Sequence, residues 1–191
     1  MSQLLDSVEP LVSSLSEEGG SLAAQAILTT DLVEKQVGFQ AQLGNRLVHI
    51  GGMAKGSGMI HPNLATMLSY ISCDAGVPED YWQSLIERVA TKSFNAISVD
   101  GDTSTNDSLI AFAGGESLDQ KYLAALEEGV LGLAQYLAKA IARDGEGATC
   151  LVQVRAEGLK TDVEARQVAR TICSSSLVKT AINGCDPNWG R

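Results

Sequence analysis

The sequence predicts an α+β fold with helices packed outside stacked sheets. Segments with helical periodicity and segments with strand character occur in groups along the chain, which is the order typical of α+β proteins. The 191 residues are 45% hydrophobic and 19% charged, a composition typical of a globular protein that buries an apolar core. This length allows one large domain or part of a bigger one, and no repeat or Pro-rich linker divides it.

The N-terminal part of the chain is predicted to be helical. In residues 2–16, apolar side chains recur every three to four positions, which places them on one helix face: Leu4, Leu5, Val8, Leu11, Val12 and Leu15. A second helix is predicted over 21–28, with Ser21 as its N-terminal cap and Thr29-Thr30 at its end. Both helices therefore precede the predicted sheet.

Three strands are predicted next. Residues 35–42 and 46–52 have strand character and flank Leu43-Gly44-Asn45, a turn typical of a β-hairpin. Residues 53–65 contain glycine and proline and are predicted to form a structured loop. Residues 66–73 carry apolar side chains on both faces, which predicts a strand buried between two layers.

The second half begins with a predicted helix over 79–92. Pro78 and two acidic residues mark its start. Ser93–Asp100 is predicted to be a strand. Residues 109–113 are either helical or a second apolar run, and the pattern does not separate these alternatives.

Three further elements complete the prediction. The longest helix is predicted over 119–142, with an apolar face of Leu123, Leu126, Val130, Leu133, Leu137 and Ile141. Residues 149–157 are predicted to be a strand. A helix over 162–174 opens with Thr161-Asp162-Val163-Glu164, a capping-box pattern. These local patterns leave the order of the strands in the sheet open.

Charge and cysteine content restrict the class of protein. The net charge of -9 disfavours nucleic acid and anionic membranes as partners. The longest apolar runs are too short to span a bilayer, and the N-terminus shows no secretory signal. Four cysteines, at positions 73, 150, 173 and 185, form no CxxC pair and match no zinc-site spacing, so no metal is expected. We expect reduced, mostly buried cysteines and a cytoplasmic protein.

The segment Gly51–Thr66 is the densest candidate for chemistry. It contains four glycines, which allow close backbone approach, and one lysine, Lys55. A phosphate-binding Walker A loop is excluded, because Lys55 precedes Gly56 instead of following the last glycine of the motif. No helix is predicted immediately after this segment, which also argues against a phosphate loop.

Thr66 fits a nucleophile that self-cleavage exposes. A threonine hydroxyl is weak, but a free α-amine on the same residue is a base with a pKa of about 8. The hydroxyl would first attack the preceding carbonyl, and the small side chain of Ala65 leaves that carbonyl accessible. An ordinary threonine at the start of a strand fits the same residues, and because Ala-Thr dipeptides are common it is the favoured interpretation on this pattern alone.

Two polar loops are further candidates. Asp100–Asp107 lacks the EF-hand spacing of a calcium loop and fits a solvent loop held by Asx and Ser/Thr turns. Glu146 lies between two glycines, and its accessible carboxylate fits a substrate ammonium. On this pattern alone, a helix C-terminal turn closed by glycine is the favoured interpretation. Thr29-Thr30-Asp31 by itself indicates a helix end, and neither histidine is assigned a role.

Together these segments resemble the glutamate N-acetyltransferase family, also called ornithine acetyltransferase. The resemblance spans nearly the whole chain, on Leu28–Asp31, Gly51–Asp74, Ser93–Asp107, Arg143–Thr149 and Asp186–Arg191. Its most specific parts are Lys55–Leu68 and Asp100–Asp107. Several independent motifs in the same order favour the nucleophile interpretation of Thr66.

The resemblance implies an αββα sandwich and autocatalytic cleavage between Ala65 and Thr66. Residues 1–65 would end an α chain and residues 66–191 would begin a β chain, with two α and two β chains associated as a heterotetramer. Thr66 would take acetyl from N-acetylornithine and pass it to glutamate through an acetyl-threonine intermediate. No cofactor is implied, and some members also use acetyl-CoA as donor.

The resemblance carries substrate contacts over to Thr30, Lys55, Thr66 and Glu146, with Thr29 as the neighbouring alternative to Thr30. Lys55 would hold a substrate carboxylate and Glu146 a substrate amine. The family extends beyond both ends of this chain, and its oxyanion-hole Thr-Gly pair comes before the first residue. We therefore expect the fragment to be inactive alone. A self-cleaving aminopeptidase or amidase, with water as acceptor, and a non-catalytic assembly partner are the alternative readings.

Overall fold

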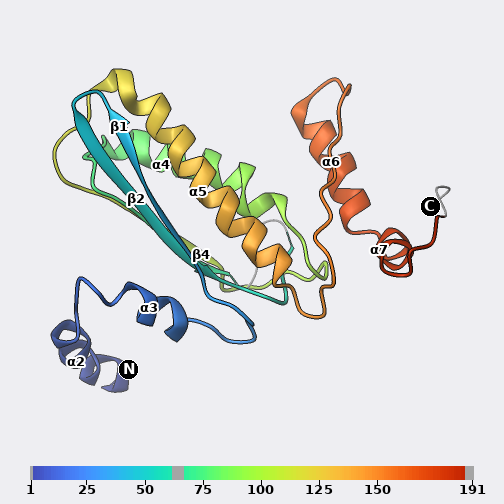
Figure 1. The fold of residues 1–191 in the computed structure, drawn as a ribbon, viewed down its shortest axis with the longest axis horizontal. Helices are drawn as coiled ribbons and strands as arrows, with labels where there is room; N and C mark the ends of the chain where they lie inside the picture. Colours follow the sequence, from blue (N-terminus) through green and yellow to red (C-terminus); the bar gives the residue numbers. More distant parts are fainter. Residues whose placement is uncertain (1, 62–66, 188–191) are drawn as a thin grey trace.

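A computed structural model describes residues 2–61 and 67–187 and shows a four-stranded sheet with its two longest helices packed on one face (Figure 1). The strands are β1 (Lys35–Leu43), β2 (Arg46–Lys55), β3 (Leu68–Cys73) and β4 (Ser108–Ala113). The helices are α1 (Ser2–Asp6), α2 (Val8–Ser13), α3 (Gly20–Ala26), α4 (Glu79–Lys92), α5 (Leu123–Arg143), α6 (Asp162–Cys173) and α7 (Ser176–Asn183), with 3-10 turns η1 (Phe94–Ala96) and η2 (Gln120–Tyr122).

The sheet places the end of β2 and the starts of β3 and β4 at the same end. Its order is β1-β2-β3-β4. β1 and β2 form an antiparallel hairpin in which Lys35 pairs with Ala54. β2 and β3 are antiparallel with Lys55 opposite Leu68, and β3 and β4 are parallel with Leu68 opposite Ser108. Lys55 therefore lies at the same end of the sheet as the starts of β3 and β4.

The core lies between the sheet and α5. Ile50 and Ile71 of the sheet and Leu137 of α5 are almost completely buried, and burying each such side chain contributes about 1.5–3 kcal/mol. α5 lies along the sheet, with α4 beside it (Figure 1). A Cβ added to Gly52 would lie 2.8 Å from Leu133 Cδ2, so glycine at this position lets α5 approach β2.

The other face of the sheet is more open. In β3, Ile71 is buried against the helices, whereas Ser72 on the opposite face is exposed. On β4, Phe112 is 61% exposed. The prediction that 66–73 is covered on both faces is therefore wrong for the described part of the chain. The α+β class is confirmed, with the described residues forming a sheet and an outer helix layer.

The N-terminal helices differ from the prediction in two details. The helix predicted over 2–16 is interrupted between Asp6 and Val8, because Pro10 has no N–H to donate to the carbonyl of Asp6. Gly19, not Ser21, is the N-cap of α3. Ser21 lies inside that helix, and its hydroxyl oxygen accepts a hydrogen bond from Gln36 Nε2 at 3.0 Å.

Two predicted strands are wrong. Ser93–Asp100 begins with the turn η1 and continues without joining the described sheet. Residues 149–157 are mostly exposed and pair with none of the described strands. Apolar composition alone does not make a strand, since its backbone N–H and C=O groups need a neighbouring strand. Residues 109–113, left open by the sequence, belong to β4.

The remaining boundaries agree closely with expectation. The helix predicted over 79–92 is α4, with those same bounds. Thr161 caps α6 by accepting from the N–H of Glu164 at 3.2 Å, as its capping pattern predicted. β2 continues to Lys55, so 53–55 are strand and not loop. The helix α7 was not predicted.

The cysteines differ from expectation in their exposure. All four are free thiols and all lie in the described ranges. Cys73 is buried, but Cys150 and Cys185 are exposed, so the prediction that most are buried is wrong. Both exposed thiols lie outside the sheet-and-α5 core, where little covers the chain.

Candidate functional site

The predicted substrate contacts come from three separate segments. Thr30 is exposed in the connection between α3 and β1. Lys55 is buried at the end of β2, and no described acceptor lies within hydrogen-bond distance of its Nζ. Glu146 is exposed just after α5. Ala65 and Thr66 lie outside the described residues, whereas Met67 is described and buried.

The loop after β2 brings Lys55 and Glu146 into one neighbourhood. The N–H of Glu146 donates to Ser57 O at 2.9 Å, and the hydroxyl of Ser57 donates to Asp144 O at 2.7 Å. A Cβ added to Gly58 would lie 2.7 Å from Glu146 Cδ, so the Glu146 carboxylate packs directly on this glycine. A larger residue at 58 would displace that carboxylate.

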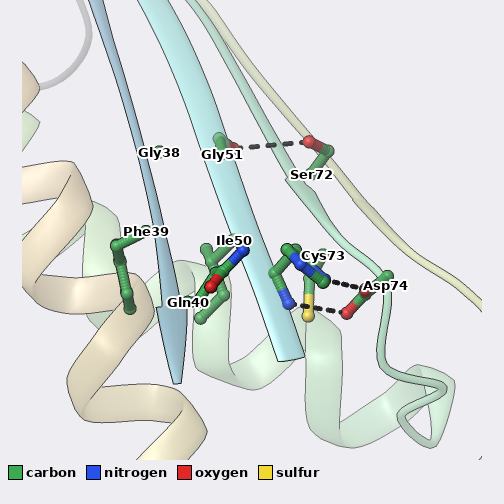
Figure 2. Close-up of a pocket in the computed structure, with 9 residues that line it drawn as sticks. Gly38, Phe39, Gln40, Ile50, Gly51, Ser72, Cys73 and Asp74 are labelled. Atoms are coloured by element: carbon green, nitrogen blue, oxygen red, sulfur yellow. Dashed lines mark hydrogen bonds and ion pairs between the residues drawn. The ribbon is translucent and has the colours of Figure 1, made fainter. Parts of the chain in front are cut away.

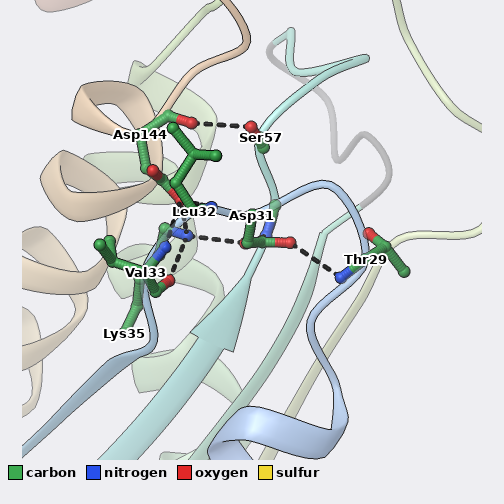
Figure 3. Close-up of polar contacts among 8 residues, drawn as sticks. Thr29, Asp31, Leu32, Val33, Lys35, Ser57 and Asp144 are labelled. Atoms are coloured by element: carbon green, nitrogen blue, oxygen red, sulfur yellow. Dashed lines mark hydrogen bonds and ion pairs between the residues drawn. The ribbon is translucent and has the colours of Figure 1, made fainter.

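A buried ion cluster joins the Thr30 segment to the same loops (Figure 3). Lys35 Nζ lies 2.7 Å from Asp31 Oδ1 and 2.6 Å from Asp144 Oδ2, with the Lys35 side chain fully buried. Asp31 Oδ1 also accepts from the N–H of Gly56 at 2.7 Å. Burial raises the pKa of Asp31, but its bonds to Lys35 and to backbone N–H groups outweigh burial and hold that pKa below its ordinary value.

Sequence reasoning missed this cluster. Asp31 and Lys35 are four residues apart, a spacing that is visible in the sequence but common in any protein. Asp144 is 109 residues from Lys35 along the chain, so no local pattern connects them. Asp31 and Asp144 both belonged to segments that were singled out, but Asp31 was interpreted as part of a helix end and Asp144 was given no role.

The polar loop 100–107 holds the backbone before the predicted cleavage site. Asp100 Oδ2 accepts from the N–H of Met59 at 2.5 Å, and its Oδ1 accepts from the N–H of Ile60 at 3.2 Å. Val99 N–H donates to Ile60 O at 2.8 Å. Met59 has a positive φ of 56°, a conformation that is rare for residues other than glycine. The Asp100 carboxylate thus fixes a strained turn.

The same loop holds the backbone after that site. Asp107 Oδ1 accepts a hydrogen bond from the N–H of Met67, and the N–H of Ser108 donates to Met67 O at 2.9 Å. Burial raises the pKa of Asp107, although the Met67 N–H and the charge of Lys55 oppose that shift. Its Oδ2 is buried and has no partner among the described residues.

The loop forms the turns expected of a solvent loop and also makes longer-range contacts. Asp102 N–H donates to Asp100 Oδ1 at 3.0 Å and Asn106 N–H donates to Ser104 Oγ at 3.2 Å, which are the expected Asx and Ser/Thr turns. The carboxylates of Asp100 and Asp107 reach further and bind the two flanks of 62–66.

The two histidines have no contact with the ion cluster. His61 Nδ1 lies 3.1 Å from Ser98 Oγ. His49 Nδ1 lies 2.7 Å from Asp74 Oδ2, in an open hollow that Gly51 and Ser72 also line (Figure 2). Since strands rise about 3.3 Å per residue, His49 is about 20 Å from Lys55 along β2.

The described ranges contain neither a candidate metal site nor a membrane-spanning helix. No group of three or more His, Cys, Asp or Glu side chains there is arranged to hold a metal ion. No helix of the described residues is long and apolar enough to cross a bilayer.

Known proteins are similar to this chain in sequence and in fold. A family model described as the ArgJ family matches residues 1–191. A protein named arginine biosynthesis bifunctional protein ArgJ from Prochlorococcus marinus (strain MIT 9313) is 66% identical over the whole chain, which covers 45% of that protein. The protein of the same name from Thermosynechococcus vestitus is 54% identical, with 47% of it covered. The chain thus spans about half the length of these curated relatives.

A solved structure extends the comparison. The crystal structure of arginine biosynthesis bifunctional protein argJ from Bacillus halodurans superposes with a TM-score of 0.62 at 43% identity. The alignment covers 65% of this chain and 62% of that chain.

Proposed function

Because this chain belongs to the ArgJ family, we propose that it supplies the nucleophile and part of the substrate site of a glutamate N-acetyltransferase of arginine biosynthesis. Acetyl passes from N-acetylornithine to Thr66 and then to glutamate. The family match over residues 1–191 supports this assignment, and the structural observation that carries it is the contact of Glu146 with Ser57 and Gly58, in the loop that follows Lys55.

The charges around the loop 56–58 suit these substrates. N-acetylornithine carries a carboxylate and a side-chain ammonium. Lys55 is a buried cation without a described hydrogen-bond acceptor, and Glu146 is an accessible carboxylate. In this proposal Lys55 holds the substrate carboxylate, Glu146 holds the ammonium, and Thr30 lines the same site. Charge-assisted contacts of this kind are short and orient a substrate strongly.

The reaction has two balanced halves. The Thr66 hydroxyl attacks the acetyl carbonyl while its own α-amine takes the hydroxyl proton. The tetrahedral intermediate collapses, the C–N bond breaks, and ornithine leaves with that proton. The α-amine of glutamate then attacks the acetyl ester, and Thr66 regains its hydroxyl. Oxyanion donors come from family segments beyond this chain, and acetyl-CoA is an alternative donor for the first half.

Self-cleavage between Ala65 and Thr66 prepares the nucleophile. The Thr66 hydroxyl attacks the Ala65 carbonyl, the peptide nitrogen leaves to become the free α-amine, and water hydrolyses the resulting ester. Asp100 and Asp107 support this step because they fix the chain on both sides of 62–66. Residues 1–65 and 66–191 stay together after cleavage through the ladder of β2 with β3, and two of each assemble as a heterotetramer.

A chimera tests the proposal. In the grafted enzyme, this chain replaces the matching segment of the Prochlorococcus marinus (strain MIT 9313) relative, to which it is 66% identical. We expect acetyl transfer from N-acetylornithine to glutamate and two chains by intact mass. Release of free acetate without transfer to glutamate would instead indicate a hydrolase. An inactive graft, beside an active parent, would refute the proposed function.

A further inference from the structure

A fully buried lysine connects the three segments that carry the proposed substrate contacts. Lys35 is the first residue of β1, and its Nζ bridges the Asp31 and Asp144 carboxylates at 2.7 and 2.6 Å (Figure 3). Asp31 is adjacent to Thr30, and Asp144 is two residues before Glu146. We propose that Lys35 is a positioning residue, whose charge keeps these segments in register for acetyl transfer. This inference rests on the proposed function.

The two carboxylates act on the backbone of the site. Asp31 accepts from the N–H groups of Thr29 at 3.2 Å and of Gly56 at 2.7 Å. Asp144 Oδ2 accepts from the N–H groups of Leu32 at 3.0 Å and of Val33 at 3.4 Å. Gly56 follows Lys55 directly in the chain. Each carboxylate therefore fixes a stretch of backbone next to a proposed contact, and it does so best when ionised.

Lys35 places a positive charge between the two carboxylates. Without that cation, the like charges of Asp31 and Asp144 would repel each other in a buried site where solvent screens them little. Such repulsion would move the carboxylates away from the backbone N–H groups that they bind. Removing the Lys35 charge should therefore loosen the connection between the Thr30 segment, the loop after β2 and the end of α5.

An ion cluster at this position is better explained by a role in positioning the site than by a contribution to stability. A buried ion pair loses its hydration, and replacement by an apolar residue of similar size is often neutral or stabilising. Lys35 nevertheless occupies a fully buried position opposite Ala54, next to Lys55. An apolar side chain would fill that position but would not orient two carboxylates. Small misplacements of reacting groups can cost about a hundredfold in rate.

Two variants of the grafted enzyme distinguish a positioning role of Lys35 from a role in folding. Lys35→Met removes the charge at similar length, and Lys35→Met/Asp31→Asn/Asp144→Asn makes the whole cluster neutral. We expect the triple variant to recover the melting temperature lost by Lys35→Met. We expect kcat/KM for N-acetylornithine to stay at least tenfold below that of the unmodified graft in both variants, with kcat lowered as well as KM raised.

A matched control uses an ion pair away from the site. Arg88 Nη2 lies 2.6 Å from Glu127 Oε2 between α4 and α5, and Arg88→Met/Glu127→Gln should leave kcat and KM unchanged. In a double-mutant cycle with Glu146→Ala, Lys35→Met should be non-additive in kcat/KM and the control additive.

These outcomes distinguish failure of the Lys35 inference from failure of the proposed function. A triple variant with normal kcat and KM would show that Lys35 serves folding alone and would overturn the inference. Full additivity with Glu146→Ala would overturn it as well. An unmodified graft without transferase activity would instead refute the proposed function, whatever the Lys35 variants show.

Discussion

Asp107 accepts a hydrogen bond from the backbone N–H of Met67, while its second carboxylate oxygen is buried without a partner among the described residues. That N–H belongs to the peptide bond that joins residue 67 to Thr66. The loop 100–107 therefore holds the chain immediately after the proposed nucleophile, as Asp100 holds it before. The predictions below address this arrangement and the proposed substrate contacts, and all variants are made in the grafted enzyme unless stated otherwise.

Thr66→Ala should give a single uncut chain without transferase activity, because the same hydroxyl serves both self-cleavage and acetyl transfer. Intact mass and acetyl transfer from N-acetylornithine measure the two effects. Thr66→Ser keeps a hydroxyl at the same position and serves as the control, which should still be cut. Normal processing of Thr66→Ala would remove Thr66 from the mechanism.

Lys55→Ala and Glu146→Ala should each lower kcat/KM about tenfold to a hundredfold, since a hydrogen bond to a charged group contributes about 1.5–3 kcal/mol. Steady-state kinetics with N-acetylornithine and glutamate measure the loss. The controls are Lys139→Ala and Glu128→Ala, which remove the same charges from exposed positions on α5. A residue whose replacement leaves kcat/KM unchanged does not contact the substrate.

Asp100→Ala should slow self-cleavage about tenfold or more, because it releases the Met59 and Ile60 N–H groups that hold the turn before the cut. The fraction of uncut chain over time, followed by intact mass, measures this. Asp102→Ala removes a neighbouring exposed carboxylate from the same loop and should cleave at the normal rate. Equal rates for the two variants would contradict the proposed role of Asp100.

Asp107→Asn should change how stability depends on pH. Because burial raises the pKa of Asp107, the folded protein holds this proton to higher pH than the unfolded chain does. The contribution of Asp107 to stability is therefore greatest below its ordinary pKa and declines as pH rises through the raised value. The free energy of unfolding of the unsubstituted graft should fall relative to Asp107→Asn as pH increases from about 4.

Urea unfolding between about pH 2.5 and 7, in the uncut Thr66→Ala background, measures that difference. Asp74→Asn is a control of opposite sign. Burial raises the pKa of Asp74, but hydrogen bonds from His49 outweigh it and lower that pKa overall. Asp74→Asn should therefore lose stability relative to the unsubstituted graft as pH rises toward the ordinary aspartate value, and the difference should stay constant above it. Parallel curves for Asp107→Asn and its parent would contradict the buried, proton-retaining state of Asp107.

Residues 1–191 expressed alone should show no measurable transferase activity. The chain spans about half the length of its relatives, and losing even one oxyanion donor costs about a hundredfold to a thousandfold in kcat. The open sheet face, with Phe112 61% exposed, should also favour aggregation of the isolated chain. Acetyl transfer assays beside the grafted enzyme measure the difference. Robust turnover by the isolated chain would place the oxyanion donors within it.

Several elements were predictable because their causes are local. The hairpin of β1 and β2 follows from alternating side chains around Gly44, which has a φ of +67°. The bounds of α4 follow from apolar spacing after Pro78. The start of α6 follows from the hydroxyl of Thr161, which binds a backbone N–H three residues away. In each case the determining contacts lie within one turn of helix or one hairpin.

Other features depend on contacts between segments that are far apart in the sequence. The apolar residues of 93–100 suited a strand, but Val99 donates to Ile60 O and packs beside the core instead of extending the described sheet. The predicted strand over 149–157 likewise found no neighbour among the described strands. Strand pairing satisfies backbone groups between segments, so it is decided by the arrangement of the whole chain.

The candidate site likewise combines residues that the sequence suggested with residues that only the folded chain brings together. The order of motifs along the chain and their resemblance to a known family were enough to suggest Thr66, Lys55 and Glu146, whose chemistry suits a nucleophile and charged contacts. The Lys35 cluster could be recognised only in the folded chain. Its partner Asp144 lies 109 residues away, and a buried lysine is stable only where folding brings carboxylates to its ammonium and excludes water from all three.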